Sequence, residues 1–510
     1  MKETTQKNLE FINKTIEKAE VYAHACNVIH YDMDTICPPD GMEKQGETAA
    51  FLGNEVYKFW KLPEFINAAE SLYEDLDELS EADRVLVEHL HRDYLRTKNI
   101  TPEQNHEFEL VYNKAFVNWS KARKNNDYSL FAPSLKEVRD VELKKISLRA
   151  EADKVPYNNL LDDYEQGMTV EKLDELFNRC KERLVPFLRK IEAASNDASI
   201  KHKIRTDFLS RPVTDEQQRK MADWLLRLLG FSFDRGNFTT SEHPFTSALA
   251  KDDVRITTHY YPTMFCSSIY SVIHECGHAL FELNTQDEDH EHHINDYKSL
   301  GQHESVSRFY ENVIGRSWAF IRLIYPKLKE VFPDVMHDVT EQELYEAVNL
   351  VQPSLVRTEA DEFTYTFHII IRYEIEKAIV NDGISLDELP ALWNKKYAEY
   401  LGVQPTTDAE GILQDVHWTS GFGYFSTYAL GNMYNAMYYK RLKSELDIDQ
   451  LILDGRFDVI NMWMKENVYK KANRLAPGEW IKDITGREFT SEDFIDYLEK
   501  KYSTIYNIKD

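Results

Sequence analysis

The chain has 510 residues, 42% of them hydrophobic and 12% aromatic, which excludes intrinsic disorder and supports an extensive core. With 61 Lys and Arg against 87 Asp and Glu, its formal net charge is -26, which argues against nucleic acid or an anionic membrane as the main partner. Its five cysteines are scattered and odd in number, and the N-terminus lacks a signal peptide, so we expect a cytoplasmic protein. No stretch approaches the roughly 18 uncharged apolar residues that a membrane span needs.

The N-terminal part of the chain is predicted to be helical. From residue 4 to about 151, apolar residues recur three and four positions apart, and the turn Cys37-Pro38-Pro39-Asp40-Gly41 ends the first long helix. Because 510 residues exceed the usual size of one core, we expect a single domain, 1–510, built in two lobes. Its N-terminal helical part is 1–230, and 231–510 carries the functional site. Later helices are predicted near 63–79, 81–98, 102–126, 133–151, 169–195 and 214–229.

The pattern changes between residues 231 and 261, where Thr, Phe, Arg and His alternate with turn residues. This alternation predicts a small β-hairpin or short sheet, whose edge can hold an extended peptide as an added strand. Helices resume at about residue 300 and are interrupted by a glycine-rich, irregular segment at 411–431. The predicted fold is therefore mainly α-helical: a large helical body with a deep groove and a small sheet.

The strongest chemical signal is His274-Glu275-Cys276-Gly277-His278, inside an apolar-periodic run at 266–284 that predicts one helix. Residues four apart lie on one face of a helix, about 6 Å apart along its axis, so His274 and His278 can bind one metal ion. Glu275 then lies beside the metal, placed to accept a proton from water and not to bind the metal. In a chain with 17 His the motif arises by chance with a probability of roughly 5%, so it needs support from other residues.

Two features lie beside this motif: a glycine inside the predicted helix and a histidine-containing segment after it. Gly277 in mid-helix costs about 1 kcal/mol relative to Ala, which predicts close approach of another backbone or of a substrate. The polar segment 285–298 contains three histidines, but the surrounding acids and irregular spacing favour a solvated loop over a second metal site. These histidines are His290, His292 and His293.

A catalytic zinc site needs a third protein ligand and one open position for water. Glu304 lies near the start of the predicted helix 299–324, and an antiparallel helix pair would bring it back over the metal. A lone helical Glu more often faces solvent. Here the neighbouring His303 and an adjoining apolar stripe favour an inward orientation; the stripe is Val306, Phe309 and Val313.

Seven motifs follow one another along the chain. They are Tyr31-Asp32-Met33-Asp34-Thr35 with Pro38-Pro39-Asp40-Gly41, His243-Pro244-Phe245-Thr246, Asp253-Val254-Arg255-Ile256-Thr257, His274 to His278, His303-Glu304-Ser305, Val356-Arg357-Thr358-Glu359-Ala360-Asp361, and Gly411-Ile412-Leu413-Gln414-Asp415-Val416-His417-Trp418. In this order they resemble the carboxypeptidase Taq family of zinc metallocarboxypeptidases over essentially the whole chain. The resemblance implies a helical zinc peptidase with a substrate groove, and a homodimer.

Carried over to this sequence, the resemblance implies His274, His278 and Glu304 as metal ligands and Glu275 as the catalytic carboxylate. The same comparison of motifs implies a substrate pocket formed by residues from later in the chain, and a loop at 243–246 near the site. The substrate-binding residues implied are Arg357, His243, Gln414 and His417.

The sequence departs from the family pattern at a few positions. Val356 stands where the family usually has Ile. After His303-Glu304-Ser305 the chain has Val306 and Ser307, where Gln is typical of the family. Ser426 replaces a usual Pro. None of these changes removes a metal ligand or Glu275, so they affect only the expected shape of the pocket.

The chemistry needs groups that stabilise an oxyanion and groups that bind a free α-carboxylate. His417 and Tyr424 are the candidates for stabilising the oxyanion. Equally weighted is the alternative that His417 is a buried structural histidine and Tyr424 a packed tyrosine. Arg357 is the first choice for the carboxylate because its planar fork forms two hydrogen bonds, and Arg255 is the second. An ordinary ion pair between Arg357 and Asp361 is the competing explanation.

The sequence thus predicts a zinc-dependent carboxypeptidase that removes single C-terminal residues from peptides with a free C-terminus. Co²⁺ or Mn²⁺ can occupy the same ligands as Zn²⁺. An endo-acting zinc oligopeptidase is the closest alternative, because the metal motif is shared. A non-catalytic peptide-binding protein with a structural metal is less favoured, because structural zinc sites usually have four protein ligands and only three are evident here.

Overall fold

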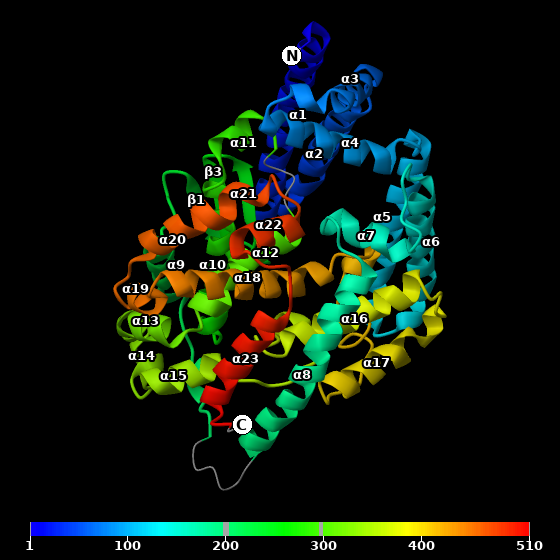
Figure 1. Ribbon diagram of the computed structural model, residues 1–510. Helices are drawn as coiled ribbons and strands as arrows, with labels where there is room; N and C mark the ends of the chain where they lie inside the picture. Colours follow the sequence, from blue (N-terminus) through cyan, green and yellow to red (C-terminus); the bar gives the residue numbers. More distant parts are fainter. Residues whose placement is uncertain (1, 197–202, 295–298, 509–510) are drawn as a thin grey trace.

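A computed structural model describes residues 2–196, 203–294 and 299–508 of the chain. The predicted N-terminal helices are present, and α7 is an additional short one. Helices α1 to α4 rise above the rest of the molecule, and α5 to α8 follow one side of it (Figure 1). These helices are α1 (Glu3–Thr35), α2 (Met42–Trp60), α3 (Pro63–Glu74), α4 (Glu81–Thr97), α5 (Pro102–Asn125), α6 (Ala132–Leu148), α7 (Pro156–Tyr164), α8 (Val170–Asn196) and α9 (Asp215–Leu229).

Local sequence signals explain where several of these helices begin. At α5 the Thr101 hydroxyl accepts a hydrogen bond from the Gln104 backbone N–H, and the Gln104 side chain accepts one from the Thr101 backbone. Thr214 and Gln217 form the same reciprocal pair at α9. Such capping boxes satisfy backbone donors that the first helical turn leaves unpaired.

The predicted short sheet is present, with three strands in the order β1-β3-β2. Strands β2 (Thr246–Ala250) and β3 (Asp253–Thr258) form an antiparallel hairpin, and β1 (Gly236–Thr240) pairs in parallel with the other side of β3. Helix α10 (Phe265–Leu283) packs on both β3 and β2. The sheet therefore supports the helix that carries the His-Glu-x-x-His motif.

The C-terminal half of the molecule is helical except for turns and the irregular segment at 411–431, of which the last residues already belong to α18. Helices α16 and α17 lie beside α5 to α8, although the sequence separates them widely (Figure 1). The helices are α11 (Asp287–Glu291), α12 (Leu300–Arg308), α13 (Trp318–Val331), α14 (Pro333–Met336), α15 (Glu341–Val348), α16 (Tyr365–Val380), α17 (Leu389–Tyr400), α18 (Ser426–Glu445), α19 (Ile448–Leu453), α20 (Phe457–Met464), α21 (Lys470–Ala472), α22 (Pro477–Thr485) and α23 (Glu492–Ile505).

The single helix predicted at 299–324 is wrong, because the structure divides it. Helix α12 is followed by a π-helical turn (Phe309–Ile314) and then by a break before α13 begins. The hydroxyl of Ser317 accepts a hydrogen bond from the Phe320 backbone N–H and so caps a new helix. The apolar stripe continued through the break, which is why the periodicity alone missed it.

The hydrophobic core has two parts. A large cluster extends from α5 to the C-terminal helix, and a smaller one joins α1, α3 and α4. Ile294, in the segment after the metal-motif helix, is 0% exposed and belongs to the smaller cluster. This side chain thus anchors residues 285–294 to the N-terminal helices. Residues 295–298 of the predicted loop lie outside the described part of the chain.

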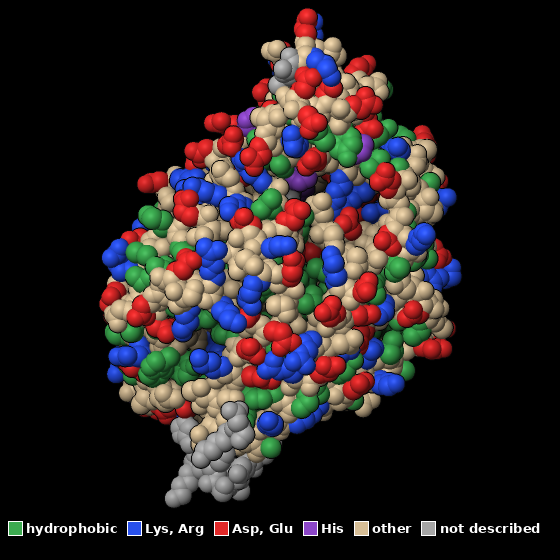
Figure 2. Space-filling view, in the orientation of Figure 1, with side chains coloured by type: hydrophobic (Ala, Val, Ile, Leu, Met, Phe, Trp, Pro, Cys, Tyr) green, Lys and Arg blue, Asp and Glu red, His purple; other side chains and the backbone are tan. Residues whose placement is uncertain are grey.

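The surface of the molecule is polar. Acidic and basic side chains alternate over the face seen in Figure 2, and a narrow hollow runs through its middle below the N-terminal helices. In the ranges that the structure describes, every helix is too short or too polar to cross a bilayer.

Candidate metal centre

Helix α10 presents the two histidines of the motif on one face. His274 and His278 are four residues apart, and their ring centroids are 4.9 Å from each other. The opposite flank of α10 is buried against the core through residues such as Ile269, Ile273 and Leu280. Burial of that apolar flank fixes the rotation of the helix and turns both imidazoles toward α12.

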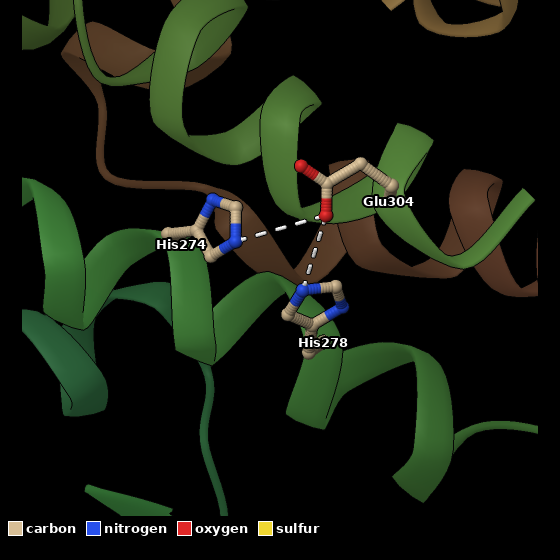
Figure 3. Close-up of side chains that lie close together, drawn as sticks. All are labelled: His274, His278 and Glu304. Carbon is tan, nitrogen blue, oxygen red and sulfur yellow. Dashed lines mark ion pairs between the residues drawn. The ribbon is translucent and has the colours of Figure 1, made fainter. Parts of the chain in front are cut away.

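Glu304 reaches these histidines from α12. Its Oε2 atom lies 3.8 Å from Nε2 of His274 and 3.5 Å from Nε2 of His278. Figure 3 shows this oxygen between the two rings, and one ligand atom from each residue lies within 4.8 Å of the others. Two imidazole nitrogens and one carboxylate oxygen fit the three-ligand set of a catalytic zinc site that keeps one position open. Among the described residues this is the one group of such side chains close enough to hold a metal.

Glycines allow α12 to lie so close to its neighbours. A Cβ atom at Gly277 would be 2.7 Å from the Cα of Ser307, which explains a glycine in the middle of the metal-motif helix. On the other side of α12, a Cβ at Gly431 of α18 would meet Glu304 at 3.1 Å. Contacts of less than 3.0 Å require the backbone to shift, so Gly277 sets the spacing of the two ligand-bearing helices.

Each histidine is oriented by a further side chain through its other ring nitrogen. Nδ1 of His274 lies 2.9 Å from Oε2 of Glu311, and Nδ1 of His278 lies 2.5 Å from Nδ1 of His303. Nε2 of His303 lies in turn 2.8 Å from Oε1 of Glu282. Such hydrogen bonds at Nδ1 leave Nε2 of both histidines free to face a metal.

Neighbouring charges in the site shift the pKa values of Glu304 and His274. Burial raises the pKa of Glu304, but Arg308 and the two histidines outweigh burial and hold that pKa well below its usual value. Burial lowers the pKa of His274, but Glu304 and Glu311 outweigh it and raise the pKa to about 9. A bound metal therefore replaces a proton at His274, and binding should weaken as the pH falls.

Glu275 is nearly buried and lines the same cavity as His274 and Glu304. The hydroxyl of Thr246, the first residue of β2, donates a hydrogen bond of 2.7 Å to Oε2 of Glu275. The same hydroxyl also lies 2.9 Å from the backbone oxygen of Glu275. The sheet thus fixes the carboxylate beside the metal position, which is the geometry that a general base needs.

The edge of β2 is partly covered. Helix α1 packs against this strand, and Nδ1 of His24 lies 2.9 Å from the backbone oxygen of Leu249. The sequence predicted a free edge at which a peptide adds as a strand. The structure leaves less of that edge open than expected, because α1 already uses one of its acceptors.

Arg357 lies in the cavity that contains the metal ligands, which has a volume of about 730 Å³. Its Nε and Nη2 atoms donate to Oδ1 of Asp415 at 3.1 and 3.0 Å, and its Nη1 donates to the Tyr365 hydroxyl at 3.2 Å. The sequence offered Asp361 as an ion-pair partner. Instead, Asp361 accepts hydrogen bonds from Gln352 and from residues at the start of α16.

Three cavity residues were missed by the sequence analysis. Arg308 donates to Oε1 of Glu304 at 2.8 Å, and its guanidinium lies 4.3 Å from the centre of the Tyr365 ring. Tyr428 lines the same cavity beside them. The spacing of four residues between Glu304 and Arg308 was the available signal, because it places both side chains on one face of α12.

Three of the predicted substrate-binding residues lie outside this cavity. Arg255 forms two hydrogen bonds with Asp253 and stacks on Tyr31. His243 is exposed, and only its neighbour Pro244 lines the cavity. Gln414 lies behind Arg357 and accepts hydrogen bonds from the Arg357 backbone N–H and from Arg372. Gln414 thus supports Arg357, whereas Arg255 and His243 make no contact with the cavity.

The two oxyanion candidates lie next to each other behind the cavity wall. Ring centroids of His417 and Tyr424 are 5.3 Å apart, and His417 also packs on Phe425. Burial lowers the pKa of His417 to about 4, so its ring is neutral at neutral pH. Tyr424 contacts Tyr428, whose hydroxyl lies 3.5 Å from that of Tyr424. Of these two tyrosines, Tyr428 is the one that lines the cavity of His274 and Glu304.

The histidines of the segment 285–298 take part in separate contacts. Nδ1 of His292 lies 2.7 Å from Asp83 of α4, and Nδ1 of His293 lies 2.9 Å from Glu20 of α1. His290 contacts the Thr285 hydroxyl at 3.0 Å. His292 and His293 thus attach the segment to the N-terminal helices, whereas His290 contacts a residue of the segment itself.

Comparison with known proteins gives full-length matches. The family model for carboxypeptidase Taq (M32) metallopeptidase matches residues 11–502. The chain is 38% identical to carboxypeptidase 1 of Bacillus subtilis (strain 168), over 96% of this chain and 97% of that protein. It is 33% identical to thermostable carboxypeptidase 1 of Pyrococcus furiosus, over 94% of this chain and 95% of that protein. The crystal structure of M32 carboxypeptidase from Deinococcus radiodurans R1 matches with a TM-score of 0.93 at 29% identity, over 98% of this chain and 100% of that one.

Proposed function

The chain belongs to the carboxypeptidase Taq (M32) metallopeptidase family and is a metallocarboxypeptidase, and we propose that it releases single C-terminal residues from peptides at His274, His278 and Glu304. One observation carries this assignment. The three ligand atoms lie within 4.8 Å of one another, in a cavity that also contains Glu275 and Arg357. One substrate can thus reach the metal position, the proposed base Glu275 and the cationic Arg357, which can bind its carboxylate.

We propose Zn²⁺ as the metal. Two imidazoles and one carboxylate with an open fourth position are typical of catalytic zinc, and Co²⁺ or Mn²⁺ can use the same ligands. A divalent ion held there supplies Lewis acidity, which activates water and polarises the carbonyl of the bond to be cleaved. Elemental analysis of the purified protein identifies the ion.

Glu275 is proposed to move the proton. It accepts one from the attacking water and donates it to the leaving amine, a role that requires the carboxylate to stay beside the metal position. The hydrogen bond from Thr246 supports this role because it restrains the Glu275 side chain. Oxyanion stabilisation remains assigned to His417 and Tyr424 as a prediction, and Tyr428 is a further candidate donor because it lines the cavity.

Arg357 is proposed to recognise the C-terminal carboxylate. Asp415 holds its guanidinium in place, and Arg372 compensates the charge of Asp415 through a second ion pair. Arg372 and Arg357 outweigh burial and hold the pKa of Asp415 well below its usual value, so Asp415 stays charged. Arg308 adds a second positive charge to the same cavity. An anionic chain end is therefore matched better than an uncharged one.

A pair of substrates separates exopeptidase from endopeptidase action. We expect an N-blocked dipeptide with a free C-terminus to be cleaved at least about 100-fold faster than its C-terminal amide, since Arg357 would lose a charged partner worth roughly 3 kcal/mol. Equal rates for the two substrates would favour an endo-acting oligopeptidase and would exclude Arg357 from carboxylate recognition.

We also propose a cytoplasmic location and a homodimer. The five described cysteines are all unpaired thiols, which fits the reducing cytoplasm. The resemblance implies a homodimer, and α5 exposes apolar side chains on its outer surface that suit such an interface. They are Leu110, Phe116 and Val117, with 55%, 52% and 49% exposed. Light scattering of the purified protein measures the oligomeric state.

A further inference from the structure

Asn473, just after α21, is a buried side chain with no partner for its amide. The residue is 1% exposed, and neither Oδ1 nor Nδ2 has a hydrogen bond within the described residues. Leaving a buried amide unpaired costs about 1–3 kcal/mol for each group, so such groups are rare unless a ligand or water completes them. Both a donor and an acceptor are thus available at one point.

Asn473 faces a cavity of about 170 Å³ that is separate from the metal cavity. Helices α4, α7, the first turn of α12 and the start of α22 enclose it near the centre of Figure 1. Roughly 10–15 Å³ of such space is enough for one water molecule, so this cavity has room for a ligand larger than a single water. We call it the Asn473 cavity.

A row of half-buried tyrosines connects the Asn473 cavity with the metal cavity. Tyr164 lines the former and packs on Tyr424 with ring centroids 5.5 Å apart, and Tyr424 packs on Tyr428 at 5.4 Å. Tyr428 lines the cavity of Glu304. These ring contacts join the linings of the two cavities, so that one peptide could occupy both.

Arginines and aspartates line another part of the Asn473 cavity: Arg92, Arg96, Asp93, Asp162 and Asp163. Arg92 and Arg96 of α4 share one carboxylate oxygen of Asp162, at 3.0 and 2.8 Å. Arg92 uses only Nη2 for its bonds within the described chain, so its Nε and Nη1 atoms remain available. Asp93 is engaged by Arg96 at 3.5 Å. The Nε and Nη1 donors of Arg92 suit a carbonyl oxygen of a ligand.

We propose that the Asn473 cavity is a distal subsite for the main chain of the peptide substrate. Nδ2 of Asn473 donates to a carbonyl oxygen and Oδ1 accepts from an N–H of a residue upstream of the cleaved bond, while Arg92 donates to a neighbouring carbonyl. The N–H and C=O of one residue in an extended peptide point to the same side and offer a donor and an acceptor that match the two atoms of Asn473. This inference rests on the proposed function, because it extends the same substrate beyond the metal cavity.

The test compares a blocked dipeptide with a peptide of about eight residues that has the same C-terminal residue. In Asn473→Ala we expect KM for the long peptide to rise about tenfold, with kcat and the kinetics of the dipeptide unchanged. Because the Asn473 side chain forms no hydrogen bond with the described residues, this variant should unfold at the same temperature as the wild type. Equal changes for both substrates, or no change for either, would overturn the proposal.

Asn467→Ala is the matched control, because Asn467 lies one helical turn or more earlier and donates only to the backbone oxygen of Trp463. Its ratio of long- to short-peptide KM should equal that of the wild type. Binding of the long peptide to Glu275→Gln protein, with and without Asn473→Ala, should differ by the same tenfold factor. If wild-type protein cleaves both substrates but Asn473→Ala alters neither, only the distal subsite is wrong; if it cleaves neither, the proposed function is wrong.

Discussion

At the scale of single residues, the two carboxylates of the site, Glu275 and Glu304, differ in the side chains that surround them. Glu304 has a histidine on each side and an arginine behind it, so it is placed to bind a metal. Glu275 receives only a hydroxyl hydrogen bond from Thr246 and faces the cavity. The difference in partners, and not in residue type, separates the ligand from the base.

We expect Glu275→Gln to lower kcat by a factor of about 10²–10⁴, the usual contribution of a general base. Metal content should stay the same, because Glu275 is not among the three ligands. Peptide hydrolysis by single turnover and elemental analysis measure the two quantities. Wild-type kcat in the pure variant would contradict the proposed role of Glu275.

Glu304→Gln tests the third ligand separately. An amide oxygen is a poorer metal ligand than a carboxylate. Loss of a residue that only hydrogen-bonds to a ligand commonly weakens metal binding about 10–100-fold. For loss of a ligand itself we therefore expect at least about a 100-fold weaker affinity for the metal. Competition with a coloured chelator measures it, and the same chelator should inactivate the wild type until metal is restored. Retention of metal by this variant after dialysis would exclude Glu304 as a ligand.

At the scale of elements, the site depends on how closely α10 and α12 pack. The motif histidines and Glu304 come from different helices, and no side chain separates the helices at Gly277. The spacing of the ligand atoms is therefore a property of a helix pair. A change in that pair should alter the site without touching any ligand.

Gly277→Ala tests this dependence. Its Cβ would lie 2.7 Å from the Cα of Ser307, so we expect a loss of about 1–3 kcal/mol in unfolding free energy and weaker metal binding. Gly53→Ala in α2 is the control, because a Cβ there meets no atom within 4 Å. On helix propensity it should stabilise the protein by up to about 1 kcal/mol. Equal effects of the two substitutions on chemical denaturation would show that packing at Gly277 is not restrictive.

Interruptions of helices were the least predictable features at this scale. The turn after the π-helical segment depends on Ser317 as a cap, and a serine also occurs within helices. The parallel pairing of β1 with β3 joins strands across a longer connection than the β2–β3 hairpin. Such choices depend on packing against α10, which the local pattern does not encode.

At the scale of the whole molecule, buried carboxylates join distant segments. Glu165, after α7, accepts hydrogen bonds from the Ser299 hydroxyl, the Gly301 backbone N–H and the Tyr434 hydroxyl. It thus connects the N-terminal half of the chain with α12, which carries the third ligand, and with α18. Burial raises the pKa of Glu165 to about 7 despite these hydrogen bonds.

This carboxyl should make stability depend on pH. Its pKa rises from 4.5 when unfolded to about 7 when folded, so between these values the folded state binds more protons. Stability is then greatest below pH 4.5 for this group and falls as the pH rises through 7, by about 3 kcal/mol in all. Glu165→Gln resembles the protonated form. The difference in unfolding free energy between pH 5 and pH 8, measured by urea unfolding, should therefore be smaller in this variant than in the wild type by most of that amount. An unchanged difference would contradict a buried, protonated Glu165.

The sequence by itself determined the helical periodicity and the helix that carries His274, Glu275 and His278. These features depend on spacing along one helix, which follows from local geometry. Only the tertiary structure decided that Glu304 faces both histidines, that Arg357 is held by Asp415, and that Arg255 and His243 lie apart from the cavity. Each of these outcomes depends on the packing of segments far apart in the chain, and that packing is set by the whole core.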